Sequence, residues 1–184
     1  VQHASRFGVD GNIRADLAEM EDMIDAYLSF AAGEGEEEPE ETQIETLLDR
    51  LVRQTAKAHG YDIQMALLDD PMPAFPVRRK SIQRAFENII SNAIAYSTKT
   101  RIGLRYRNDE VSILFDDDGA GIPAERRADA LRPFIRLEES RNRKTGGTGL
   151  GLSITSDIVL GHGGELKLDD SPLGGLRVAI KLPV

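Results

Sequence analysis

The residues of this sequence that are best suited to chemistry lie in a glycine-rich run. It reads Thr145-Gly146-Gly147-Thr148-Gly149-Leu150-Gly151-Leu152-Ser153-Ile154 and continues into apolar residues with helical spacing. Glycines let the backbone approach a ligand closely, and a helix start offers unpaired N–H groups and a positive dipole end to an anion. The run therefore predicts a phosphate-binding loop that opens a helix. A flexible loop is the alternative, because short glycine motifs match often by chance.

A second candidate is a pair of asparagines, Asn88 and Asn92. They share one face of a helix that the apolar residues predict from Arg79 to about Tyr96. Asparagine is a mediocre helix former, and its amide needs hydrogen-bond partners when it is buried. The pair indicates either a polar network or a ligand held by side-chain oxygens. Such oxygens suit Mg²⁺, which combines them with waters and substrate phosphates.

A third candidate is an acidic turn at the end of a predicted strand. The turn reads Asp116-Asp117-Asp118-Gly119-Ala120-Gly121-Ile122-Pro123. Binding residues are often found where a rigid sheet ends in a turn, so these carboxylates are candidates for a site. A solvated acidic turn is the alternative, and this stretch alone favours it.

Basic side chains gather just before the glycine run. Residues 131–146 contain five basic and two acidic residues in a chain of net charge −8, the basic ones being Arg132, Arg136, Arg141, Arg143 and Lys144. A long polar loop without periodicity is either functional or disordered. We interpret this one as a mobile lid whose side chains pair with phosphate.

Composition and charge exclude several classes of function. The 184-residue chain has a net charge of −8, whereas binding a nucleic-acid backbone requires a basic face. It has no cysteine, and therefore no disulfide framework, thiol nucleophile or zinc ribbon. No apolar run reaches the roughly 18 residues of a membrane-spanning helix, and we see no signal peptide. We expect a soluble fragment with one well-buried domain and a smaller appendage.

The appendage is a predicted helix near the N-terminus. Apolar residues recur there in steps of four and three, at Ile13, Leu17, Met20, Ile24, Tyr27 and Ala31. This narrow stripe suits another helix in a bundle or dimer, and a surface helix packed on its own domain is the alternative. The glutamate-rich residues 34–41 repel one another and bury nothing, which indicates a linker and a domain boundary.

Hydrophobic periodicity and turn residues predict the elements that must position the candidate residues. We expect helices at 44–58, at 79–96 and from the glycine run to about 160. We expect strands at 61–68, 72–77, 100–107, 111–117, 165–168 and 176–182. Two hairpins are predicted among them, closed by Asn108-Asp109-Glu110 and by Ser171-Pro172-Leu173-Gly174-Gly175.

Together these motifs resemble a known family. The matched stretches are Arg84 to Ala93 (the N box), Asp117 to Gly121 (G1), Arg132 to Arg136 (F), Gly147 to Leu152 (G2) and the last glycine motif, Gly174-Gly175-Leu176. In this order they resemble the ATP-binding catalytic domain of sensor histidine kinases, within the wider GHKL or HATPase family shared with gyrase and MutL. The heptad helix resembles, more weakly, the second helix of the family's dimerisation and histidine-phosphotransfer hairpin.

The resemblance implies a fold and a domain plan. The fold is α+β, a two-layer α/β sandwich of the Bergerat type with a mixed sheet on one side and helices on the other, preceded by a coiled-coil-like helix. Residues 1–33 are then a partial phosphotransfer helix, 34–41 an acidic linker and 42–184 the ATP-binding catalytic domain.

The resemblance also assigns roles to single residues. Asn92, with Asn88 beside it, holds Mg²⁺ against the triphosphate, while Asp117 accepts a hydrogen bond from the adenine amino group and Tyr96 packs on the base. Arg136, Arg141 and Lys144 neutralise the γ-phosphate. The full ATP-binding set is Asn88, Asn92, Tyr96, Asp117, Gly119, Gly121, Ile122, Phe134, Gly147, Thr148, Gly149, Leu150, Gly151 and Leu152.

The implied activity is transfer of the γ-phosphoryl group of ATP to a histidine on a dimerisation helix, followed by relay to a response regulator. The whole protein is expected to be a homodimer anchored in a membrane, with this fragment in the cytoplasm. None of His3, His59 and His162 lies in a phosphoacceptor motif, so the fragment alone should not phosphorylate itself.

The sequence departs from the family pattern at Ala95, where the N box usually has Lys or Arg before the tyrosine. One expected phosphate contact is therefore missing. Together with the missing acceptor, this departure motivates an alternative: a GHKL nucleotide-binding regulatory module, either a serine kinase or a pseudokinase, that acts by binding a partner.

Overall fold

A computed structural model describes residues 37–68, 72–135, 137 and 149–184. The chain divides into two compact units, Val1–Glu36 and Glu37–Val184, and the description concerns the second. The predicted heptad helix at 13–31 and His3 lie outside the described residues.

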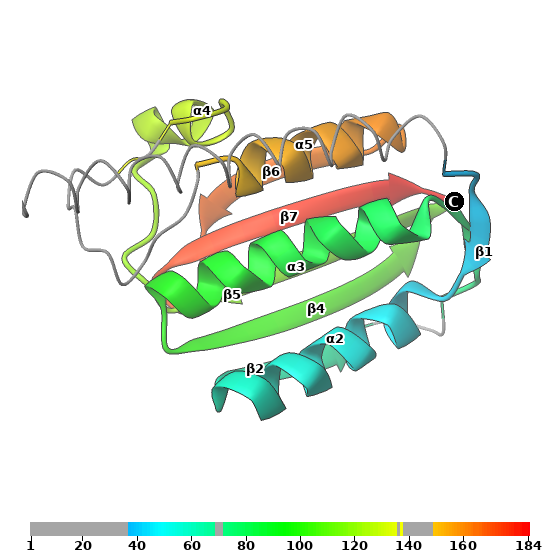
Figure 1. The fold of residues 1–184 in the computed structure, drawn as a ribbon, viewed down its shortest axis with the longest axis horizontal. Coiled ribbons are helices and arrows are strands. Elements are labelled where there is room, and N and C mark those ends of the chain that lie inside the picture. The colour runs from blue at the N-terminus through cyan, green and yellow to red at the C-terminus, as the bar shows by residue number, and fades with distance from the viewer. Residues whose placement is uncertain (1–36, 69–71, 136, 138–148) are drawn as a thin grey trace, which may run out of the picture. The chain divides into compact units, whose positions relative to one another are not determined.

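Five strands form one mixed sheet in the order β2-β4-β5-β7-β6 (Figure 1). The edge strand β2 (Asp62–Leu67) runs parallel to β4 (Lys99–Arg107), and the long connection between them contains a helix, as a parallel pair requires. The other neighbours, β5 (Glu110–Asp117), β7 (Leu176–Pro183) and β6 (Glu165–Asp170), pair antiparallel. The two predicted hairpins are confirmed.

Three helices cover one face of this sheet: α2 (Ile44–His59), α3 (Arg79–Tyr96) and α5 (Gly151–Gly161) (Figure 1). Strand residues alternate between the helices and the open face, so β5 buries Val111, Ile113 and Phe115 in the core. The predicted α+β fold, with helices on one side of a mixed sheet, is confirmed.

Local sequence signals account for the ends of several elements. The helix α3 begins and ends at the predicted residues. The helix α2 ends at His59 and is capped by Gly60, whose φ of +61° suits a glycine. Asn108 and Asp109 have φ of +54° and +57°, the left-handed pair of the tight turn that joins two twisted strands.

The fold differs from the prediction around the first strands. The strand predicted at 72–77 is only Phe75–Val77 (β3), and it pairs with Glu40–Thr42 (β1) in a separate two-stranded sheet. Prolines interrupt this region, which limits its pairing to a short edge ladder. Residues 37–41 of the predicted linker belong to the second compact unit, and none of them is buried.

The short helices η1 (Ala124–Arg126) and α4 (Arg127–Ala130) follow the acidic turn and were not predicted. They are too short to show a periodic pattern. In the part of the chain that the structure describes, none of the helices has both the length and the apolar composition needed to cross a membrane.

Candidate functional site

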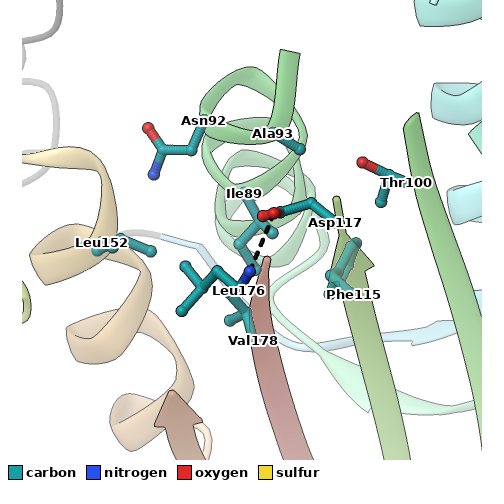
Figure 2. A pocket seen from close by; sticks show the side chains of 9 residues that line it. All are labelled: Ile89, Asn92, Ala93, Thr100, Phe115, Asp117, Leu152, Leu176 and Val178. Atoms are coloured by element: carbon teal, nitrogen blue, oxygen red, sulfur yellow. Dashed lines mark hydrogen bonds between the residues drawn. The ribbon is translucent and has the colours of Figure 1, made fainter. Parts of the chain in front are cut away.

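A cavity that is partly open to solvent lies where α3, the start of α5 and the ends of the central strands meet (Figure 2). Its lining is apolar except for three polar side chains, a composition common in ligand pockets. The residues are Ile89, Asn92, Ala93, Thr100, Phe115, Asp117, Leu152, Leu176 and Val178.

Asp117 is the carboxylate that faces this cavity. It ends β5, and its Oδ1 accepts hydrogen bonds from the backbone N–H groups of Gly119 at 2.8 Å and Leu176 at 3.0 Å. Figure 2 shows the second of these bonds crossing from β7 to Asp117. Its Oδ2 has no hydrogen-bond partner among the described residues, so one acceptor oxygen is free for a ligand.

The two neighbouring carboxylates have other partners. Asp116 is 3% exposed and pairs with Arg177 through hydrogen bonds of 2.6 and 2.9 Å on the other face of the sheet. Asp118 accepts hydrogen bonds from the Thr98 hydroxyl and from the N–H groups of Lys99 and Thr98, which together lower its pKa to about 2. Of the three, only Asp117 lines the cavity.

The glycines of the acidic turn are required by contacts within the chain. A Cβ at Gly119 would lie 2.5 Å from the Tyr96 carbonyl oxygen, and Gly121 has a φ of +70° and lies against Gly175. The turn is therefore packed between the end of α3 and the β6–β7 turn. A close approach to a ligand, as predicted from the sequence, is not needed to explain these two glycines.

The two asparagines of α3 differ in their contacts. Asn88 donates from its side-chain amide to the carbonyl of Gly151 at 3.2 Å and so joins α3 to the start of α5. Asn92 lines the cavity, extends toward the α5 side in Figure 2 and has no hydrogen-bond partner among the described residues. The side-chain oxygen of Asn92 is available to a cation or another ligand. In Asn88 the side-chain nitrogen is used in the bond to Gly151, and the side-chain oxygen has no partner among the described residues.

The start of α5 has no side-chain cap among the described residues. The first N–H groups of a helix have no partners within it, so this end can bind an anion with the help of the helix dipole. Gly149 has a φ of +69°, Leu152 lines the cavity, and the Leu150 side chain is buried in the core at 2% exposed. Leu150 can therefore contribute to a site only through its backbone.

Three further predicted residues that the structure describes, Tyr96, Ile122 and Phe134, are not among the lining residues of the cavity. Tyr96 at the end of α3 is 45% exposed, and the Ile122 carbonyl accepts from the Arg127 guanidinium at 3.0 Å. Phe134 is 57% exposed and has a φ of +64°, which is rare for a bulky residue and marks a strained backbone. The predicted residues Arg136, Arg141, Lys144, Gly147 and Thr148 lie outside the described residues.

Sequence reasoning missed the polar group beside the cavity. The Tyr61 hydroxyl bonds the hydroxyls of Ser97 and Thr100 and the carbonyl of Ala93. These residues come from the α2–β2 junction, the end of α3 and the start of β4, so no local pattern connects them. Of the two lining residues on β7, Leu176 belongs to a motif found in the sequence, the last glycine motif, and Val178 does not.

Comparison with known proteins agrees with this arrangement. Residues 77–184 match the profile of the family described as histidine kinase-, DNA gyrase B-, and HSP90-like ATPase. The chain is 47% identical over 130 residues to the sensor histidine kinase CpxA of Escherichia coli (strain K12), covering 70% of this chain and 28% of that protein. The chain thus spans less than a third of the length of this relative.

Solved structures share the fold. The ATP-binding domain of PrrB from Mycobacterium tuberculosis superposes with a TM-score of 0.64 at 26% identity, covering 79% of this chain and 96% of that one. Full-length ShkA in complex with AMPPNP has a TM-score of 0.75 at 20% identity, covering 98% of this chain and 39% of that one. At that identity the second likeness concerns the fold alone.

Proposed function

The chain belongs to the family of histidine kinase-, DNA gyrase B- and HSP90-like ATPases, and we propose that it is the ATP-binding catalytic part of a sensor histidine kinase. It binds Mg-ATP and supports transfer of the γ-phosphoryl group to a histidine on a dimerisation helix, for relay to a response regulator. One observation carries the proposal. An apolar cavity has the carboxylate of Asp117 on its wall, and the start of α5, which contributes Leu152 to the lining, has no side-chain cap among the described residues.

In this proposal the cavity receives the adenine ring. The apolar side chains of Ile89, Phe115 and Val178 exclude water from the ring, and Oδ2 of Asp117 accepts from the amino group. GTP presents a carbonyl oxygen at that position, which a carboxylate oxygen repels. The site is therefore expected to prefer ATP.

The phosphates then extend toward the start of α5, where unpaired N–H groups and the helix dipole favour negative charge. Asn92 and Asn88 offer side-chain oxygens on the same side, a donor type that fits Mg²⁺. The described residues contain no cluster of three or more acidic, histidine or cysteine ligands, so an ion here would depend on the asparagines, water and phosphate. A bound Mg²⁺ supplies charge neutralisation to the triphosphate.

Catalysis of phosphoryl transfer requires mainly that the reacting groups are positioned and that the negative charge of the phosphates is neutralised. The chain's own contribution is to hold the base with Asp117 and the phosphates with the start of α5, so that the γ-phosphate reaches an acceptor on another segment. Arg136, Arg141 and Lys144 remain the predicted partners of the γ-phosphate. The domain plan, the cytoplasmic location and the membrane anchor also remain predictions.

The histidines support an acceptor elsewhere. His162 uses both ring nitrogens in backbone hydrogen bonds, accepting from Arg78 N–H at 3.0 Å and donating to the Ile158 carbonyl at 2.7 Å. His59 is exposed at the end of α2 and lies in no acceptor motif. The fragment is therefore expected to bind ATP without phosphorylating its own histidines.

The test supplies the missing acceptor. The chain is incubated with labelled ATP and a partner fragment that has the family's acceptor helix but a disabled ATP site. We expect acid-labile, base-stable label on the partner's histidine, as phosphohistidine requires. Asp117→Asn should abolish the transfer, and the exposed-surface variant Glu38→Gln should retain it.

The alternative, a regulatory nucleotide-binding module, is motivated by Ala95, which is exposed on α3 where the family usually has a basic residue. ATP binding without transfer to a matched acceptor would favour the pseudokinase, and label on serine would favour the serine kinase. Label on His3, His59 or His162 would contradict the proposed acceptor.

A further inference from the structure

The turn between β6 and β7 is closed by its own hydrogen bonds. Ser171 N–H donates to the Gly175 carbonyl at 2.9 Å, and Gly174 N–H donates to the Ser171 carbonyl at 2.9 Å. The Ser171 hydroxyl, which is buried, accepts from the N–H of Leu173 at 3.0 Å. The turn therefore has a defined shape that does not depend on a ligand.

This turn lies directly against Asp117. Gly175 N–H donates to the Asp117 carbonyl at 3.2 Å, and the next N–H, that of Leu176, donates to Oδ1 at 3.0 Å. A Cβ at Gly175 would overlap both Oδ1 of Asp117 and the nitrogen of Gly119. The contact leaves room only for glycine.

Two arginines hold the same parts together from either side. Arg177, next to Leu176 on β7, pairs with Asp116 on β5. Arg127 donates to the carbonyl of Ile122 and pairs with Asp169 at the end of β6. Asp116 and Ile122, on the two sides of Asp117 in the chain, are thereby tied to β7 and β6, the strands that the β6–β7 turn connects.

We propose that the β6–β7 turn is a positioning element for base selection, because the N–H of Leu176, with that of Gly119, occupies Oδ1 of Asp117 and leaves Oδ2 as the one acceptor for a bound base. This inference rests on the proposed function. A free carboxylate can rotate and offer either oxygen to several ligand geometries, whereas one held by two N–H groups presents one acceptor in one direction. Fixed acceptors discriminate strongly between a donor and an acceptor on the ligand.

Two glycine variants separate this role from backbone strain. Gly175→Ala places a methyl group against Oδ1, and its neighbour Gly174→Ala is the control. Gly174 has a φ of +101°, so alanine is strained there, but its Cβ would meet no atom within 4 Å. ATP and GTP affinities are measured by calorimetry. Gly175→Ala should reduce the ratio of ATP to GTP affinity by about tenfold or more, the range of one hydrogen bond to a charged group, and Gly174→Ala should keep it.

A second pair of variants serves if Gly175→Ala does not fold. Leu176→Pro removes the N–H that bonds Asp117 and keeps a smaller apolar side chain at this lining position, the first residue of β7, where proline is tolerated. Leu176→Ile keeps the N–H and an apolar side chain as the control. The proline variant should lower the ATP-to-GTP ratio by about tenfold, and the isoleucine variant should not.

Equal losses of ATP and GTP affinity in Gly175→Ala and Leu176→Pro would overturn the inference, since they would show that the turn only stabilises the fold. The inference is also overturned if the unaltered chain prefers ATP and both variants keep that preference. If the unaltered chain itself binds ATP and GTP alike, the proposed base recognition fails and the inference fails with it.

Discussion

The helices α3 and α5 pack side by side, yet the N–H groups at their N-termini differ in their hydrogen-bond partners. The carboxylate of Glu37 accepts hydrogen bonds from the N–H groups of Lys80 at 2.6 Å and Ser81 at 3.1 Å at the start of α3. The N–H of Arg78 donates to His162, so the first turn of α3 is supplied with acceptors by the chain itself. The start of α5 has no side-chain cap among the described residues.

This difference separates a structural helix end from a functional one. Capping a helix start by a side chain stabilises a protein by roughly 0.5–2 kcal/mol, so an uncapped start leaves that gain unused. At α3 the cap comes from outside the helix, from the acidic run that composition alone predicted to be a linker. At α5 no side chain among the described residues caps the start, and the side chain of Asn92, which lies 3.7 Å from a Cβ placed at Gly151, has no hydrogen-bond partner among those residues; this suits an anionic ligand with a cation.

The largest expected effect on ATP affinity comes from placing a negative charge at the start of α5. Gly151→Asp places a carboxylate in its first turn, where it satisfies the helix dipole and repels phosphate. A Cβ at this position would come no closer than 3.7 Å to its neighbours, so the backbone accommodates a side chain there. We expect ATP affinity, measured by calorimetry, to fall at least about 100-fold, in line with like charges near a protein surface.

Gly151→Ala is the matched control, because it adds the same Cβ without the charge. It should keep ATP affinity within a few-fold and raise the free energy of unfolding by about 0.4–1 kcal/mol, the usual gain from replacing a helix glycine. If the aspartate variant binds ATP as well as the alanine variant does, the start of α5 is not the phosphate end.

A smaller loss of ATP affinity is expected from replacing Asn92, which lies near the start of α5. Asn92→Ala should weaken Mg-ATP by about tenfold or more and metal-free ATP much less, because it removes a candidate oxygen ligand. Calorimetry with and without Mg²⁺ makes the measurement, and Ser91→Ala, an exposed neighbour on α3, is the control. Equal losses in both conditions would exclude the metal role.

The smallest effect on ATP affinity is expected at the start of α3, which Glu37 caps. Glu37→Ala should lower the free energy of unfolding by about 0.5–2 kcal/mol and leave ATP affinity unchanged, because the cap lies at the opposite end of α3 from the asparagine that lines the cavity. Chemical denaturation makes the measurement, and Glu38→Ala, an exposed neighbour, is the control. A loss of ATP affinity with unchanged stability would reverse the roles of the two helix ends.

The contribution of Glu37 should also depend on pH. Burial raises the pKa of its carboxyl, but hydrogen bonds from Lys80 and Ser81 outweigh this, and the pKa lies below the usual 4.5. A lowered carboxyl pKa means that its stabilisation is full above about pH 4.5 and is lost as the pH falls through the lower folded-state value. The difference in the free energy of unfolding between the unaltered chain and Glu37→Ala should therefore vanish in acid. The difference between the unaltered chain and Gly151→Ala should persist there.

Much of the fold could be predicted because its signals are local. The apolar spacing of α3 and the left-handed pair Asn108 and Asp109 depend only on residues a few positions apart. The failures were the short helices η1 and α4, which show no period, and β1, whose partner β3 is far along the chain.

The sequence by itself determined the order of the long helices and of the strands of the five-stranded sheet, the candidate residues Asp117, Asn88 and Asn92, and the resemblance to an ATP-binding family. These follow from composition, periodicity and motif spacing, which are properties of the chain. Only the tertiary structure decided how those residues are used. One of the two partners of Asp117 Oδ1, Leu176, is 59 residues away, and Glu37, which caps α3, is 43 residues upstream of Lys80. Hydrogen bonds between such distant segments depend on how the helices pack on the sheet, and no local pattern records that packing.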